Sequence, residues 1–215
     1  MIESHSNLFV GTQYDEEAIR GREDWFVVSA AKFPYHKDAL GYDGREAPKD
    51  HAEYAFARRP GSLILNLVDA DDVKFIGPET VSAAVDGIHE HIGCRKVLVH
   101  CNQGVSRSPS IAFLYLLKFT DHFRRESFDE DLQDFLRLYP PYEPGRGMSE
   151  FVRDNWSTYV AGTKLNGAPP FAETLACVGT IEKGRNPQLS NENRGGANMV
   201  ETDGKTYINA IKGFE

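Results

Sequence analysis

A short loop between a strand and a helix constrains this chain more than any other stretch of its sequence. The run Lys96–His100 is apolar and β-branched, which is typical of a buried strand. The apolar stretch that begins at Ser108-Pro109 predicts a helix, because Ser is a good N-cap residue and Pro suits the first helical position. Residues 101–107 must therefore lead the chain directly from a strand into the N-terminus of a helix.

Such a loop is suited to binding an anion. The unpaired backbone N–H groups and the dipole of a helix N-terminus favour negative charge, and Gly104 lets the backbone fold tightly with its amides pointing inward. Arg107 adds a planar fork of donors that matches two oxygens of a phosphoryl group. The residues expected to bind the phosphoryl oxygens are Asn102, Gln103, Gly104, Val105, Ser106 and Arg107.

Cys101 lies at the floor of this loop. The same positive field favours a thiolate, because the pKa of a cysteine falls from about 8.5 to roughly 3.5–7.5 in such surroundings. Cys101 would then be a ready nucleophile at neutral pH. From their positions, we expect Ser108 to donate its hydroxyl to the sulfur and His100 to brace the loop through its ring nitrogens.

The segment His100–Pro109 (HCNQGVSRSP) resembles the Cys-X5-Arg signature of the protein tyrosine phosphatase superfamily, and its Ser-Arg-Ser ending looks most like the dual-specificity branch. The resemblance covers roughly residues 7–160. It implies an α/β fold of the phosphatase type, with a central, mostly parallel sheet flanked by helices. It also implies a cysteine-dependent phosphatase with a cysteinyl-phosphate intermediate, which requires no cofactor and no metal ion.

Hydrolysis also requires a carboxylate that protonates the leaving oxygen and later activates water. The apolar run Ser62–Val68 predicts a strand that leads into Asp69, Asp71 and Asp72. The resemblance implies that the general acid is an Asp on such a loop, and that Phe75 is the apolar anchor following it. Asp71, which lies 30 residues before the cysteine, is the first choice, and Asp69 and Asp72 stay open as alternatives.

Composition excludes several other classes of function. With 215 residues, 40% of them hydrophobic and 26% charged, the chain is long enough for a globular core. It has no apolar run of transmembrane length and no signal peptide, so we expect a cytoplasmic protein without a membrane partner. The net charge of -8 argues against a nucleic-acid partner. Three cysteines suit a reducing compartment, and a disulfide between Cys94 and Cys101 is not expected at their spacing.

The remaining patterns fit one catalytic domain over residues 1–161. An insertion over about 33–60 is longer than a usual connection between strands. A solvated insertion of mixed charge is the favoured interpretation, and the alternative is that its cations meet a second charge on a substrate. The cations concerned are Lys37, Arg45, Arg58 and Arg59. The other expected elements are strands at Leu8–Gly11 and Trp25–Ser29, and helices at Asp15–Ile19, at 77–92, from Ser127 to Tyr139 and from after Met148 to about Tyr159.

Residues 162–215 form a C-terminal extension, expected to be rich in β structure, which the resemblance does not explain. The segment Met199–Ile208 predicts a β-hairpin with a turn at Asp203-Gly204, and Thr174–Ile181 predicts a further strand. A two-stranded unit alone is marginal in water. We expect the extension to pack on the catalytic domain, to mediate self-association with a second copy of the chain, or to be partly disordered.

The sequence thus favours a phosphomonoester hydrolase whose leading substrate is a phosphorylated protein, through phosphotyrosine and phosphoserine or phosphothreonine. The loop positions Asn102, Gln103, Val105 and Ser106 are uncharged, unlike the lysine-bearing loops of the family's inositol-lipid phosphatases. A phosphorylated carbohydrate or nucleotide is the alternative substrate. From a different class, the chain could be a phospho-residue-binding module that uses the loop without turnover.

Overall fold

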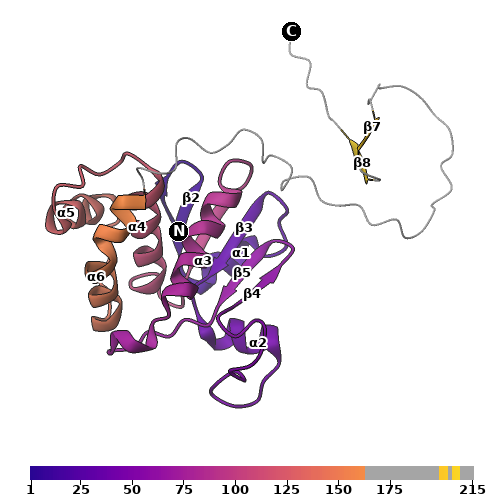
Figure 1. Cartoon of the computed structure of the whole chain (residues 1–215), viewed down its shortest axis with the longest axis horizontal. Helices are drawn as coiled ribbons and strands as arrows, with labels where there is room; N and C mark the ends of the chain where they lie inside the picture. The colour runs from indigo at the N-terminus through magenta and orange to yellow at the C-terminus, as the bar shows by residue number, and fades with distance from the viewer. Residues whose placement is uncertain (163–198, 203–204, 209–215) are drawn as a thin grey trace, which may run out of the picture. The chain divides into compact units, whose positions relative to one another are not determined.

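A six-stranded sheet lies at the centre of the fold, and four of its strands are parallel (Figure 1). The computed structural model describes residues 1–162, 199–202 and 205–208. The order across the sheet is β1-β2-β6-β3-β5-β4, and the two edge strands, β1 and β4, run antiparallel to their neighbours. The mostly parallel α/β sheet expected from the sequence is therefore confirmed. The strands are β1 Ile2–His5, β2 Leu8–Gly11, β3 Trp25–Ser29, β4 Phe56–Arg59, β5 Ser62–Leu65 and β6 Lys96–His100.

Three parallel strands end at the same level of the sheet. Gly11 of β2 and Ser29 of β3 both pair with His100, the last residue of β6. Ligands of α/β sheets bind beyond the carboxyl ends of the strands. The register therefore brings the chain that follows each of these strands to the same edge, where residue 101 begins its loop.

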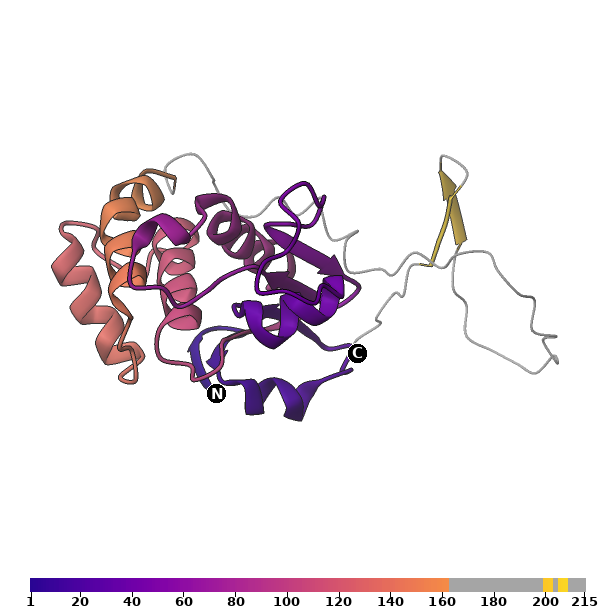
Figure 2. The ribbon, with the colours of Figure 1, turned by 90° about the horizontal axis from the view of Figure 1, so that it is seen from below.

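Helices cover both faces of the sheet, as Figure 2 shows from below. The connection from β2 to β3 and the connection from β5 to β6 cross the sheet in opposite directions, so right-handed crossovers put α1 and α3 on opposite faces. The helix α4 then follows β6. The helices are α1 Gln13–Ile19, α2 Lys37–Leu40, α3 Pro78–His91, α4 Arg107–Phe119, α5 Phe128–Leu138 and α6 Arg146–Gly162, with short turns at Lys32–His36 and Val73–Phe75.

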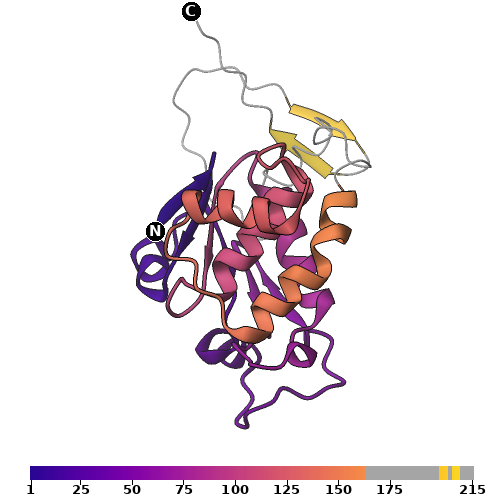
Figure 3. The same cartoon turned by 90° about the vertical axis from the view of Figure 1, so that its left-hand side faces the viewer.

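The helix α4 is buried almost throughout, since every residue from Arg107 to Leu117 is buried. Its Phe113 stacks on Phe135 of α5, with ring centroids 4.9 Å apart. Figure 3 shows α6, in orange, running along α4. The helix that begins at the Cys101 loop is thus fixed by packing on all sides, which makes its N-terminus a rigid platform.

Two predicted boundaries are wrong for local reasons. The helix α4 begins at Arg107 with Ser106 at the N-cap position, rather than with Ser108 there. Ser106 makes no capping bond because its hydroxyl contacts other loops, which are described below. The strand β5 ends at Leu65 instead of continuing to Val68, since Asn66 already turns toward the preceding loop, where its side-chain amide donates to the Tyr54 carbonyl oxygen at 2.8 Å.

The region predicted as an insertion over 33–60 is in part a piece of the central sheet. Its last residues form β4, and Phe56 pairs with Leu65 at the start of a regular antiparallel ladder. The buried His36 closes the loop that precedes β4, because its Nε2 lies 3.0 Å from the carbonyl oxygen of Glu53. The sequence did not reveal β4, because Arg58 and Arg59 make it read as a polar segment.

In the C-terminal region, Met199–Thr202 (β7) and Lys205–Ile208 (β8) form an antiparallel pair with Thr202 opposite Lys205. This pairing confirms the predicted hairpin, in which a two-residue connection joins the strands. The strand predicted at Thr174–Ile181 lies outside the described residues. Self-association through residues 162–215 stays a prediction.

Candidate active site

Cys101 is buried at the foot of the loop that follows β6, with 1% of its surface exposed. The backbone N–H of Gly104 donates to its sulfur at 3.2 Å. The Ser108 hydroxyl lies 3.3 Å from the same sulfur and 3.4 Å from the Gly11 carbonyl oxygen. Cys101 is a free thiol, so it forms no disulfide with Cys94.

These contacts decide the protonation of Cys101. Burial alone raises the pKa of its thiol, but the hydrogen bonds from the Ser108 hydroxyl and backbone outweigh it, together with the Arg107 charge and the Gly104 N–H. The net result is a pKa below the ordinary value for cysteine. A lower pKa means that the thiolate, the nucleophilic form, is present at a lower pH.

Replacing Ser108 with alanine should raise this pKa, because the thiolate loses the hydroxyl donor that stabilises it most. The rate of alkylation by iodoacetamide rises with pH as the thiolate forms, so its midpoint should lie below that of a free cysteine in the wild type. In Ser108→Ala the midpoint should move to higher pH. Mass spectrometry of alkylated Cys101 across a pH series measures both midpoints, and equal midpoints would contradict a role for the hydroxyl.

Gly104 allows the loop to close tightly over the sulfur. Its φ of 77° lies in the left-handed region, and a Cβ there would approach the Gly11 carbonyl oxygen to 3.0 Å. The Tyr139 hydroxyl, at the end of α5, donates to the Gly104 carbonyl oxygen at 2.8 Å. That carbonyl is thus held away from the sulfur, while the Gly104 N–H points at it.

Arg107 lies beside the loop with part of its guanidinium unengaged. One terminal nitrogen donates to the Leu67 carbonyl oxygen at 3.2 Å, and the other donates to the Asn102 Oδ1 at 2.8 Å. Its buried Nε has no hydrogen-bond partner and lies 3.7 Å from the Asp69 carboxylate. Each terminal nitrogen carries a second N–H, and these two N–H groups stay available for oxygens of an anion.

Asn102 positions this guanidinium, a role that the sequence did not reveal. Its side-chain amide spans the loop, since Oδ1 accepts from Arg107 while Nδ2 donates to the Gln13 Oε1 at 3.3 Å and to the Phe33 carbonyl oxygen at 3.2 Å. The start of α1 and the segment after β3 are therefore both tied to the loop through one side chain.

Ser106 joins the loop to two other segments. Its hydroxyl donates to the Asp69 Oδ1 at 2.9 Å and accepts from the Gly145 backbone N–H at 3.0 Å. Next to it, the Glu143 N–H donates to the Val105 carbonyl oxygen at 2.8 Å. The predicted acid loop and the entry to α6 therefore both lie against the Cys101 loop.

The three aspartates of the acid loop have different surroundings. Asp69 binds Ser106 and lies near Arg107, whereas Asp72 accepts from the Lys74 N–H at 3.0 Å and pairs with the Lys74 side chain. Asp71 is exposed and makes no hydrogen bond or ion pair with the residues that the structure describes. The apolar anchor predicted at Phe75 is wrong, because this ring is 60% exposed and the neighbouring Ile76 is the buried residue.

The ring of His100 contacts β3, and its expected role in bracing the loop stays a prediction. Its fully buried ring points to β3, where Nε2 lies 2.9 Å from the Ser29 Oγ, and the Tyr35 ring meets it edge-on at 4.7 Å. Burial lowers the pKa of His100 to about 4, so the ring is neutral near pH 7. His100 therefore fixes β6 against β3 directly beneath Cys101.

Comparison with known proteins identifies the fold. No family model matches the sequence, and no curated protein is similar to it. The crystal structure of DUSP15 superposes with a TM-score of 0.51 at 14% identity, over 78% of this chain and 97% of DUSP15. The chain has the fold of the dual-specificity phosphatases. Human DUSP28 gives a TM-score of 0.43 at 17% identity over 78% of this chain and 100% of its own.

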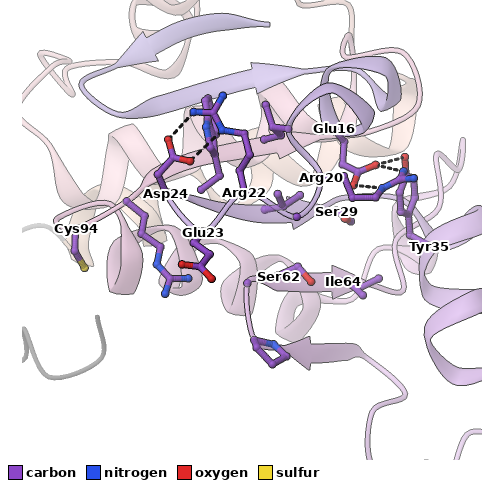
Figure 4. A pocket seen from close by; sticks show the side chains of 17 residues that line it. Glu16, Arg20, Arg22, Glu23, Asp24, Ser29, Tyr35, Ser62, Ile64 and Cys94 are labelled. Carbon is purple, nitrogen blue, oxygen red and sulfur yellow. Dashed lines mark hydrogen bonds and ion pairs between the residues drawn. The ribbon is translucent and has the colours of Figure 1, made fainter. Parts of the chain in front are cut away.

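In this dual-specificity phosphatase fold, a groove of about 750 Å³ lies on the sheet face that carries α1 (Figure 4). Ser29 and Tyr35 lie at one end of it and Cys94 at the other. Glu16 lies at the same end of the groove as Tyr35. Its carboxylate accepts hydrogen bonds from Arg20 at 2.5 Å and from the Tyr35 hydroxyl at 3.4 Å. The groove lies behind His100 and contains no residue of the Cys101 loop.

Two properties of the described residues bear on the class of site. Among them, no three His, Cys, Asp or Glu side chains are grouped to hold a metal ion. None of the helices they form has the length and apolar character needed to cross a bilayer.

Proposed function

We propose that the chain is a phosphomonoester hydrolase that works through a cysteinyl-phosphate intermediate. The observation that carries this proposal is the buried free thiol of Cys101, which receives two hydrogen bonds beneath a loop whose Arg107 keeps two terminal N–H groups available. A thiolate and a guanidinium placed this way suit a phosphoryl group better than other anions, because three equatorial oxygens need donors in the transition state.

In the first step, the Cys101 thiolate attacks phosphorus and an S–P bond forms as the bond to the leaving oxygen breaks. The loop amides from Asn102 to Arg107 and the Arg107 guanidinium hold the three remaining oxygens. Asp71, protonated at this stage, gives its proton to the departing alcohol or phenol. The step leaves a phosphorylated cysteine and an ionised Asp71.

In the second step, Asp71 takes a proton from a water molecule, whose oxygen attacks phosphorus and displaces the sulfur. The S–P bond breaks and the electron pair returns to Cys101 as a thiolate. Ser108 assists this departure because its hydroxyl, at 3.3 Å, donates to the developing negative charge. The products are inorganic phosphate and the original protonation state of the protein.

Asp71 is our choice for the acid because its carboxyl is free to reach a leaving group. Asp69 is held by Ser106 and Asp72 by Lys74. An acid must lie within hydrogen-bond reach of the leaving oxygen, and an exposed side chain without partners can adopt that position. In this proposal Asp69 keeps the acid loop docked on the Cys101 loop.

Turnover of an aryl phosphate by the full chain tests the function and the acid together. Asp71→Asn should lower kcat by roughly 10²-fold and remove the acid-side dependence of the pH profile, which is the usual weight of a general acid. Asp72→Asn is the matched control, with an expected change of less than about 3-fold. If Asp71→Asn keeps wild-type activity while Asp69→Asn abolishes it, the assignment moves to Asp69. A wild-type chain that binds tungstate but shows no turnover is a binding module, and the enzyme proposal is then wrong.

We propose phosphotyrosine and phosphoserine or phosphothreonine in proteins as the substrates. The uncharged side chains of Asn102, Gln103, Val105 and Ser106 support this choice, because they offer no cations for a highly anionic headgroup. A phosphorylated carbohydrate or nucleotide is the alternative. A reactive thiolate also has to stay reduced, which supports a cytoplasmic location.

A further inference from the structure

The cations of segment 33–60 are mostly engaged within the protein. Arg58 pairs with Glu90, and Arg59 pairs with Glu53. The Lys37 ammonium donates to the Asp43 carbonyl oxygen at 3.2 Å. These side chains are therefore poor candidates for binding a second negative charge on a substrate. Lys32, the cation just before this segment, is a better one.

Lys32, directly before the segment, is a largely covered side chain whose ammonium has no counter-ion among the described residues. Only 8% of its surface is exposed. Among the described residues, no carboxylate lies within ion-pair distance of its ammonium. Its ammonium lies over the Phe33 ring, with the Nζ 5.3 Å from the ring centroid. The Nζ itself is not fully buried, so the aliphatic stem of the side chain is covered while the ammonium reaches the surface.

The backbone of Lys32 and Phe33 is attached to the groups that hold Arg107. The Lys32 N–H donates to the Leu67 carbonyl oxygen at 2.9 Å, and Arg107 donates to the same oxygen at 3.2 Å. The Phe33 carbonyl oxygen accepts from Asn102, whose own oxygen accepts from Arg107. Two short chains of contacts thus fix this dipeptide beside the phosphoryl site.

Phe33 gives this position access to the outside, since 42% of its surface is exposed. The ammonium lies over the ring in a cation–π arrangement, which stabilises the charge only in part. A substrate that contacts the exposed ring would come within reach of the ammonium. The dipeptide therefore combines an apolar wall with a cation that has no anion of its own.

We propose that Lys32 and Phe33 form a second subsite, which takes an anionic group next to the phosphate ester of the substrate. This inference rests on the proposed phosphatase function and specifies its substrate as an acidic phosphopeptide. The phosphoryl group binds the Cys101 loop, and the carboxylate of a neighbouring acidic residue binds the Lys32 ammonium. The positive charge is thereby neutralised only when an acidic substrate is bound.

Three phosphotyrosine peptides that differ only in the adjacent residue test the subsite, together with phenyl phosphate, which has no second charge. The wild type should favour the Glu peptide over the Gln peptide by about ten-fold in kcat/KM, the effect of one charged hydrogen bond. Lys32→Met should remove this preference and leave phenyl phosphate turnover within about 3-fold. A third peptide, with phosphothreonine at that position, tells whether a phosphate satisfies the subsite as a carboxylate does.

Lys37→Met is the matched control, because it removes a nearby ammonium that already has a carbonyl partner. It should keep the full preference, as should Lys32→Arg, which retains the charge. Thermal unfolding shows whether Lys32→Met is folded. Independently of any variant, the Glu-over-Gln ratio of the wild type should shrink at high ionic strength.

Three results would overturn the subsite: a wild type that does not distinguish the Glu and Gln peptides, a Lys32→Met variant that keeps the preference, or an equal loss on phenyl phosphate. The last result would mean that Lys32 acts on the phosphoryl group itself. A failure of the proposed function looks different, because the wild type would then turn over none of these esters.

Discussion

Cys101→Ser should abolish turnover of aryl phosphates, with kcat lowered by roughly 10⁴-fold or more. The sulfur lies in a buried position that is built to hold it as a thiolate, with donors at 3.2 Å from Gly104 and 3.3 Å from Ser108. A serine hydroxyl is far less acidic than a thiol, so the same contacts would not ionise it at neutral pH. The measurement is single-turnover hydrolysis followed by acid quench, which traps a phosphorylated enzyme only in the wild type.

The Cys101→Ser variant should still fold and bind an oxyanion. Oxygen and sulfur differ little in size at this position, and the donors of the loop backbone and of Arg107 remain. Tungstate should therefore raise the thermal unfolding midpoint of the wild type and the variant alike. Appreciable steady-state hydrolysis by Cys101→Ser would exclude the cysteinyl-phosphate mechanism.

Arg107→Lys should lower kcat/KM by about 10²–10³-fold, even though the charge is retained. The guanidinium is held at two points, by the Leu67 carbonyl and by Asn102, so that its remaining N–H groups have a fixed direction. A lysine ammonium is a point charge and cannot satisfy these two acceptors and two phosphoryl oxygens at once. Steady-state kinetics on phenyl phosphate and a vanadate inhibition constant measure the loss.

A useful control for Arg107→Lys is Arg153→Lys, which changes an exposed arginine of α6. It should leave kcat/KM within about 2-fold, because exposed ion pairs contribute little. If Arg107→Lys kept wild-type kinetics, charge alone would account for phosphate binding, and the fork geometry would have no catalytic role.

The parts of the site that could be predicted from the sequence depend on local chemistry. The Cys101 loop is set by neighbouring residues: an apolar strand before it, Gly104 within it and an apolar helix after it. The helix α5 was predictable for the same reason, because Ser127 accepts from the Glu130 N–H as its N-cap position suggests. Such signals act within a few residues and do not require knowledge of the packing.

Contacts between distant segments were beyond the reach of the sequence. Ser106 and Asp69 are 37 residues apart in the sequence. Because the Ser106 hydroxyl donates to Asp69, it does not accept a capping hydrogen bond from the backbone of α4. Asn102 contacts Phe33 across 69 residues. Whether Lys32 has a counter-ion depends on which side chains lie near it in the fold, so no pattern of residues along the chain could predict it.

The close approach of α6 to the acid loop has a mechanical consequence. A Cβ on Gly147 would lie 2.3 Å from the Ala70 carbonyl oxygen, so the first turn of the helix touches the backbone beside Asp69 and Asp71. The backbone of the loop is therefore packed closely against the start of α6 at this point. Because α6 continues from this contact to Gly162, a substitution that shifts the first turn of the helix would also shift the loop that carries the proposed acid, Asp71.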